Sequence, residues 1–100
     1  MMTVNIQYVK MLSSDTMTEY VKKKLAKLET NFDWVINANV FFKSENDPKG
    51  EGHICEIELS LPGPKIFASS NEINFELAAK NSIKDLAKQL EKRKASFNKH

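Results

Sequence analysis

The sequence contains a single cysteine, Cys55, and only two histidines, three glycines and three prolines among its 100 residues. One cysteine can form neither an internal disulfide nor a multi-cysteine metal cage, and the two histidines, His53 and His100, lie far apart in the chain. We therefore expect no metal and no cofactor. The sequence also has no glycine-rich segment leading into a helix, which excludes the usual phosphate-cradling loop of nucleotide-binding enzymes.

Long apolar runs are missing as well. No segment approaches the roughly 20 apolar residues that a membrane-spanning helix needs, and the N-terminal residues alternate polar and apolar side chains instead of forming the apolar core of a signal peptide. We expect a cytoplasmic protein in a reducing compartment. With 41% hydrophobic residues the chain can bury one modest core, so residues 1–100 are predicted to form a single domain.

The net charge of +2 conceals a segregation of charge along the chain. Residues 1–28 contain five lysines and two acidic residues, residues 29–79 contain three lysines and nine acidic residues, and residues 80–100 contain seven basic and two acidic residues. Both ends are therefore basic, and the middle is acidic. Segregated charge favours a partner of opposite charge at one particular surface.

Alternating polar and apolar residues predict four strands, over residues 3–9, 34–42, 53–61 and 65–69. In the second strand the apolar phase comprises Ile36, Ala38, Val40 and Phe42. Residues 44–52 and the Pro-Gly-Pro sequence at 62–64 have the composition of turns.

Four aromatic side chains lie in or beside the predicted strands. Phe42 and Phe67 are expected to be buried, whereas Trp34 and Phe41 are candidates to border an exposed apolar patch.

Two amphipathic helices are predicted between and after these strands. The first follows the candidate N-caps at 13–15, has an apolar stripe with the spacing of a helix from Met17 to Leu28, and ends near residues 30–32. The second begins near Asn71 or Asn74, carries a similar stripe, and runs to about Ser96. The resulting order is βαβββα, an α+β fold in which two helices cover one face of a mainly antiparallel sheet, as in double-stranded-RNA-binding domains.

Most lysines of the two helices fall away from the predicted core. At about 100° per residue, the second helix carries a ladder of lysines at i, i+4 spacing on its solvent side: Lys80, Lys84, Lys88 and Lys92. In the first helix, Lys23, Lys24 and Lys27 share one flank with Tyr20, which is most simply a boundary packing residue. Helices lying side by side would join these residues into one basic face suited to a phosphate backbone, although solvated lysine-rich faces are common.

Catalytic chemistry has little support in the sequence. His53 and Cys55 point to the same side of one strand, as a nucleophile and its base would, but Cys55 is in phase with apolar residues and is better explained as a buried side chain. Glu56 and Glu58 resemble paired catalytic carboxylates and are better explained as the solvated side of a sheet. We therefore expect a protein that is not an enzyme.

Two segments resemble a known family. YVKKKLAKLETNF (20–32) and NEINFELAAKNSIKDLAKQLEKRK (71–94) are similar to the two helices of the ribosome hibernation promoting factor and ribosome-associated inhibitor family, also called the sigma-54 modulation family, and the Leu-Pro-Gly turn at 61–63 fits it too. The resemblance implies a non-enzymatic translation regulator that binds the small ribosomal subunit in the mRNA and tRNA channel, through 16S rRNA, and promotes ribosome hibernation under stress or in stationary phase.

The resemblance also implies which residues contact RNA. Matching basic positions are Lys24, Lys27, Lys88, Lys92, Arg93 and Lys94, whereas Lys23, Lys80 and Lys84 are added from the helical geometry. Asp85, Glu91 and Asn74 depart from the family pattern.

With 100 residues the chain resembles the short form of this family, without the second domain that pairs ribosomes, so ribosome dimerisation would need a helper protein. The alternative function is a protein–protein interaction module that uses the sheet face or edge.

Overall fold

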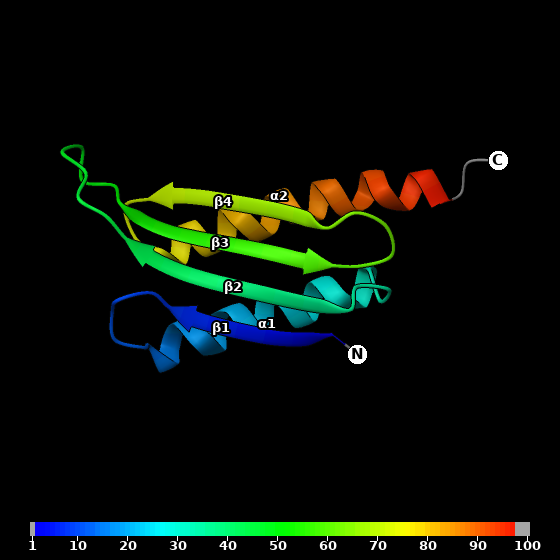
Figure 1. The fold of residues 1–100 in the computed structure, drawn as a ribbon, viewed down its shortest axis with the longest axis horizontal. Helices are drawn as coiled ribbons and strands as arrows, with labels where there is room; N and C mark the ends of the chain where they lie inside the picture. Colours follow the sequence, from blue (N-terminus) through cyan, green and yellow to red (C-terminus); the bar gives the residue numbers. More distant parts are fainter. Residues whose placement is uncertain (1, 98–100) are drawn as a thin grey trace.

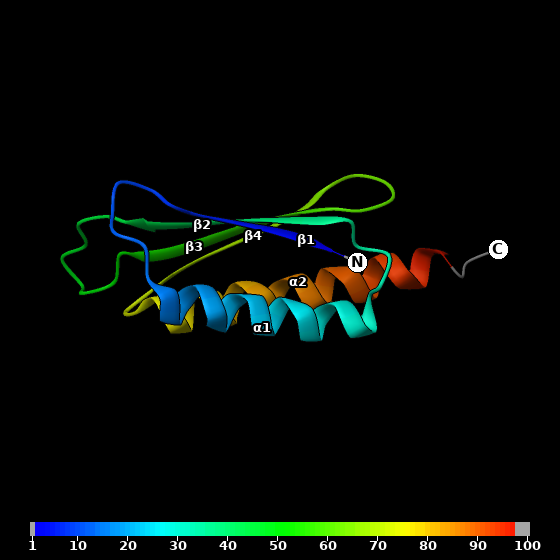
Figure 2. The ribbon, with the colours of Figure 1, turned by 90° about the horizontal axis from the view of Figure 1, so that it is seen from below.

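The computed structural model describes residues 2–97, which form a four-stranded sheet with two helices packed against one of its faces (Figures 1 and 2). This arrangement confirms the predicted α+β class and the order βαβββα. The elements along the chain are β1 (Thr3–Tyr8), α1 (Asp15–Asn31), β2 (Asn37–Ser44), β3 (His53–Ser60), β4 (Ile66–Glu72) and α2 (Phe75–Phe97).

The strands lie in the order β1-β2-β3-β4, so every strand pairs with its neighbour in the sequence. β1 and β2 are parallel, because α1 connects them and returns the chain to the end of the sheet at which β1 begins. β2, β3 and β4 pair antiparallel. The sheet is therefore mixed, with one parallel and two antiparallel pairs.

The hydrophobic core lies between the sheet and the two helices. Buried residues alternate along β2 and β3, and on the helices they follow the predicted stripes, with Leu25 of α1 and Leu86 of α2 fully buried. Phe42 of β2 lies in the middle of this core, where its ring stacks on Tyr8 at a centroid distance of 5.0 Å and meets the edge of Phe75 at 5.5 Å. These contacts join the sheet to the N-terminal end of α2.

Each helix begins at a side-chain cap. The Ser14 hydroxyl accepts a hydrogen bond from the Met17 N–H at 3.2 Å, and the Asn74 side-chain oxygen accepts one from the Leu77 N–H at 2.8 Å. Asn71, the other candidate cap, lies in β4 instead, and its side-chain oxygen accepts from the Gly52 N–H at 2.6 Å. Asn74 is therefore the residue that starts α2.

Two predictions of burial were wrong. Phe67 is 53% exposed, because β4 begins with Ile66 facing the helices and the next side chain must face the opposite side of the sheet. Ile36 is 58% exposed, because it precedes β2, which begins only at Asn37. Across residues 2–97, neither helix combines the length and the apolar character that crossing a membrane requires.

Candidate nucleic-acid interface

The two helices form a layer of their own beneath the sheet. They lie side by side and run in the same direction, with both C-terminal ends at the same end of the molecule (Figure 2). Together they carry ten basic and six acidic residues, although they contain well under half of the 100 residues. Seven lysines of the two helices lie on the side away from the sheet. We call the surface that carries them the helix face, and it comprises Lys23, Lys24, Lys27, Lys80, Lys84, Lys88 and Lys92.

A groove between the helices brings basic residues from both of them together. Tyr20 and Lys24 of α1 line one wall, and Leu77 and Lys80 of α2 line the other. Lys24 lies over the Tyr20 ring, with its Nζ atom 5.6 Å from the ring centroid, and a second hollow on α1 is lined by Tyr20, Lys24 and Lys27 together with Lys23. The lysine-bearing flanks of α1 and α2 thus meet at this groove, as the sequence analysis expected for helices that lie side by side.

The four-lysine ladder of α2 winds around the helix. Each step of four residues advances about 40° beyond a full turn, so successive lysines move from one flank towards the other. Lys80 accordingly lines the groove beside α1, whereas Lys92 lines a shallow hollow on the far flank, together with Ile66 at the start of β4. All four side chains are exposed, so the ladder extends the helix face across α2.

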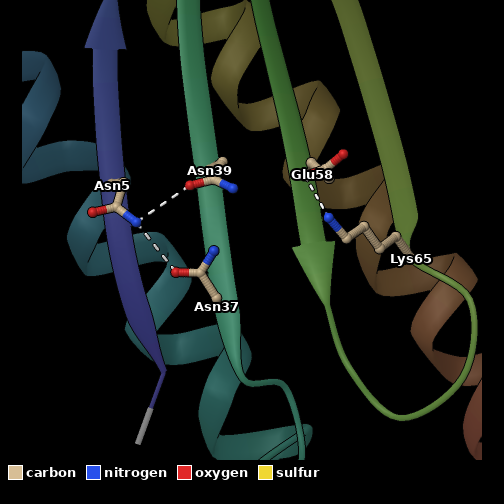
Figure 3. A network of polar contacts seen from close by, with 5 residues as sticks. All are labelled: Asn5, Asn37, Asn39, Glu58 and Lys65. Atoms are coloured by element: carbon tan, nitrogen blue, oxygen red, sulfur yellow. Dashed lines mark hydrogen bonds and ion pairs between the residues drawn. The ribbon is translucent and has the colours of Figure 1, made fainter.

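Two acidic residues of the middle segment are ion-paired on the side of the sheet opposite the helices. There Glu56 pairs with Lys43 at 2.7 Å and Glu58 pairs with Lys65 at 3.5 Å. Figure 3 shows the second pair together with the hydrogen bonds from Asn5 of β1 to Asn37 and Asn39 of β2. Between residues 2 and 97, no lysine of the helices has a carboxylate within ion-pairing distance. Lysines are therefore ion-paired on the open face of the sheet, whereas those of the helix face form no ion pair within residues 2–97.

One acidic residue does reach the groove. Glu76 lines it near the N-terminal end of α2. The pKa of Tyr20 is raised, first because the hydroxyl is partly removed from water and then because Glu76 is close. At neutral pH the Tyr20 hydroxyl is therefore protonated and can donate a hydrogen bond to an oxygen in the groove.

Arg93 has a structural partner that the sequence analysis did not foresee. Its two terminal nitrogens donate hydrogen bonds to the carbonyl oxygens of Pro62 and Pro64, both at 2.8 Å, and so fasten the turn after β3 to α2. Gly63 lies between these prolines with φ of 93°, and a Cβ atom there would lie 2.8 Å from an Arg93 nitrogen. Arg93 is thus set apart from the exposed lysines of the helix face, and no spacing in the sequence signals this contact.

Lys94 and the two aromatic candidates are also placed by the structure. Lys94 lies over the Phe32 ring, with its Nζ atom 5.9 Å from the ring centroid. Trp34 packs on the helix side of the sheet, against Phe32 and Phe97, whereas Phe41 alternates with buried neighbours and lies on the open face. Trp34 and Phe41 therefore do not form one patch.

The four candidate catalytic residues of the sequence are poorly placed for a reaction: His53, Cys55, Glu56 and Glu58. Cys55 is fully buried, and burial, with a smaller effect of Glu56, raises the pKa of its thiol to about 12. The His53 ring meets the edge of Phe75 at 4.8 Å, and Glu56 and Glu58 are held by lysines. Among residues 2–97, no three histidine, cysteine or acidic side chains gather in a way that suits a metal ion.

The environment of Cys55 predicts an unreactive thiol. At pH 8 we expect a maleimide to label the folded protein about a thousandfold more slowly than the urea-unfolded chain, because a thiol with a pKa of about 12 provides far less thiolate than one near 9.0. The higher pKa of the Cys55 thiol in the folded state also makes that state less stable as the pH rises from about 9 towards 12, because in this range only the unfolded chain releases the thiol proton. Rapid stoichiometric labelling of the folded protein, followed by mass spectrometry, would contradict this assignment.

Comparisons of the sequence with known proteins find similar proteins that are named for ribosomes. Residues 4–98 match the family described as sigma 54 modulation protein / S30EA ribosomal protein. A ribosome hibernation promoting factor from Pseudomonas putida is 29% identical over 93 residues, which cover 93% of this chain and 87% of the relative.

Two solved structures have the same fold. The first is a ribosomal subunit interface protein from Coxiella burnetii, with a TM-score of 0.80 and 23% identity over 95% of this chain and 99% of that one. The second is the N-terminal domain of Protein Y from Thermus thermophilus, with a TM-score of 0.77 and 22% identity over 92% of this chain and 98% of that one.

Proposed function

The chain belongs to the sigma 54 modulation protein / S30EA ribosomal protein family, and from this premise we propose that it regulates translation by binding the small ribosomal subunit through its helix face. The protein acts by occupying a site and carries out no reaction. Residues 1–100 serve as one ribosome-binding domain, and the site of action is the cytoplasm, where ribosomes are found.

The observation that carries this proposal is the uncompensated charge of the helix face. Lys24 and Lys80 meet in one groove, and the exposed lysine ladder continues from it, while Glu56 and Glu58 are paired with lysines on the other side of the sheet. A surface of this kind gains binding free energy from a polyanion, because each phosphate that it neutralises releases a condensed counterion. Ribosomal RNA supplies such phosphates in a fixed, structured array.

The proposed contacts follow from this geometry. The lysines of the helix face contact phosphates of 16S rRNA in the mRNA and tRNA channel, and Lys94 contributes at its end. Arg93 contributes chiefly by holding the turn at 62–64 in place, because its terminal nitrogens already donate to two carbonyl groups. Occupation of the channel excludes mRNA and tRNA, which stops initiation and leaves ribosomes in hibernation during stress or stationary phase.

The names of two similar proteins support an action on ribosomes. The curated relative is a ribosome hibernation promoting factor, and one solved neighbour is a ribosomal subunit interface protein. We propose that the present chain acts at the same stage of translation. We further propose that a separate helper protein takes part when two inactive ribosomes pair.

Co-sedimentation with purified subunits tests the proposal. At low salt we expect the protein to pellet with small subunits and with whole ribosomes, and to stay in the supernatant with large subunits. Small subunits already loaded with mRNA and initiator tRNA are expected to bind at least tenfold less protein. Equal binding to both subunits, or no effect of loading, would contradict the proposed site.

A further inference from the structure

The C-terminal end of α2 projects beyond the sheet (Figures 1 and 2). Phe97, the last residue of α2, belongs to an aromatic cluster. The Trp34 ring meets the Phe97 ring at a centroid distance of 5.0 Å and an angle of 74°, and it meets Phe32 at 6.0 Å and 84°. Lys94 lies over the Phe32 ring. We call Phe32, Trp34, Lys94 and Phe97 the aromatic end.

Phe97 occupies an unusual position for a large apolar side chain. It lies seven residues, or about two turns, after Leu90 and so continues the buried side of α2. The sheet no longer covers α2 there, and Phe97 is 45% exposed, whereas Leu90 is fully buried. Phe32 is 3% exposed and anchors the cluster to the core, so Trp34 and Phe97 form an aromatic surface on a rigid base.

From this surface we propose that the aromatic end binds an unpaired nucleobase of an RNA strand whose phosphates lie along the helix face. This inference rests on the proposed function and names a further contact for it. Aromatic rings stack on bases of any sequence, and each such stack typically contributes a tenfold or greater gain in affinity. A base fits better than an apolar peptide, because the cluster includes the cation of Lys94 and lies at the C-terminal end of α2, the helix that carries the lysine ladder.

The charges at the aromatic end make stacking the main source of affinity there. Asp33 precedes Trp34, Glu91 lies one turn before Lys94, and the donors of Arg93 are engaged by the turn at 62–64. The electrostatic attraction is therefore weaker here than in the groove between the helices. Loss of the stack should lower RNA affinity by a similar factor at every salt concentration, whereas loss of a lysine should change the salt dependence.

Trp34 allows a direct test, because it is the only tryptophan. The full chain would be titrated with a single-stranded ten-nucleotide RNA and with a blunt RNA duplex of the same sequence, while Trp34 emission is recorded. We expect saturable quenching by the single strand, little quenching by the duplex, and about tenfold weaker single-strand binding for Phe97→Ala at both 50 and 150 mM salt.

Two further variants separate stacking from packing. Phe97→Leu keeps an apolar side chain but removes the ring, so it should lose affinity as Phe97→Ala does, and Phe97→Tyr should keep it. Phe67→Ala removes a phenylalanine from the open face that is 53% exposed, slightly more than Phe97, and should bind like the unmodified chain. Unchanged affinity in Phe97→Ala, full affinity in Phe97→Leu, or equal quenching by the duplex would overturn the inference.

The outcomes also separate this inference from the proposed function. If Phe97→Ala binds the single strand as well as the unmodified chain does while small-subunit binding is intact, only the nucleobase site is wrong. If the ring-dependent binding of the single strand is found but the protein does not bind small subunits, the nucleobase site stands and the ribosomal function is wrong.

Discussion

Replacing Lys84, Lys88 and Lys92 with glutamate is expected to lower the affinity for small subunits by more than about a hundredfold. All three side chains are exposed on α2, and none pairs with a carboxylate of residues 2–97. Reversal removes three cations from the proposed interface and introduces three anions that phosphates repel. Affinity would be measured by co-sedimentation at 50 mM salt.

The fold should survive this triple reversal. The three positions face solvent, and like charges four residues apart on a helix repel by only a few tenths of a kcal/mol whether they are positive or negative. The far-UV circular dichroism spectrum and the melting temperature should therefore stay close to those of the unmodified chain. A variant that is folded and still binds with full affinity would exclude the ladder from the interface.

A control variant distinguishes the effect of where the lysines lie from the effect of the change in net charge. Lys10, Lys49 and Lys65 are exposed lysines away from the helices, and their replacement by glutamate changes the net charge by the same amount. We expect the control to retain affinity within a few-fold. An equal loss in both triple variants would mean that the RNA responds to net charge alone. The pair Lys24→Glu and Lys27→Glu extends the test to α1 and should also weaken binding.

The lysine ladder shows how much of the site is visible in the sequence. The i, i+4 spacing from Lys80 to Lys92 is enough to place all four side chains on the exposed side of α2, as the structure confirms. The same periodicity placed Val21 and Leu25 in the core, and the residue types at 13–15 placed Ser14 among the candidate caps. Such features depend on local geometry, which a short segment determines by itself.

Features that depend on contacts between distant segments were not predictable. The choice of Asn74 over Asn71 as the cap depends on the Gly52 N–H, which lies 19 residues before Asn71 and occupies its side-chain oxygen. In the sequence, nothing distinguishes Arg93 from the other basic residues of α2. Its hydrogen bonds to the turn at 62–64 form only because the fold places that turn beside α2. Phe67 was expected in the core because aromatic residues usually are buried in strands, yet the phase of β4 is decided by Ile66.

The pairing of the acidic residues is another long-range feature. Glu56 and Glu58 share one side of β3 in the sequence, but their partners, Lys43 and Lys65, come from the strand before and the turn after. Only the register of the sheet brings them together. The pairs keep Glu56 and Glu58 on the open face of the sheet, away from the lysines of the helix face.

The second large effect that we expect is a steep dependence of binding on salt. A protein that neutralises six to ten phosphates typically loses about 10³- to 10⁵-fold in affinity between 50 and 200 mM salt. Seven lysines make up the helix face, so binding to small subunits should fall within this range. The triple variant at Lys84, Lys88 and Lys92 should also have a shallower slope, because it makes fewer phosphate contacts.

The measurement that tests the central claim most directly is therefore the slope of log affinity against log salt concentration for purified small subunits. We predict a steep negative slope for the unmodified chain and the control with changes at Lys10, Lys49 and Lys65, and a clearly shallower one for the triple ladder variant. Affinity that stays constant between 50 and 200 mM salt would contradict the account, because the helix face could not then be the surface that binds RNA.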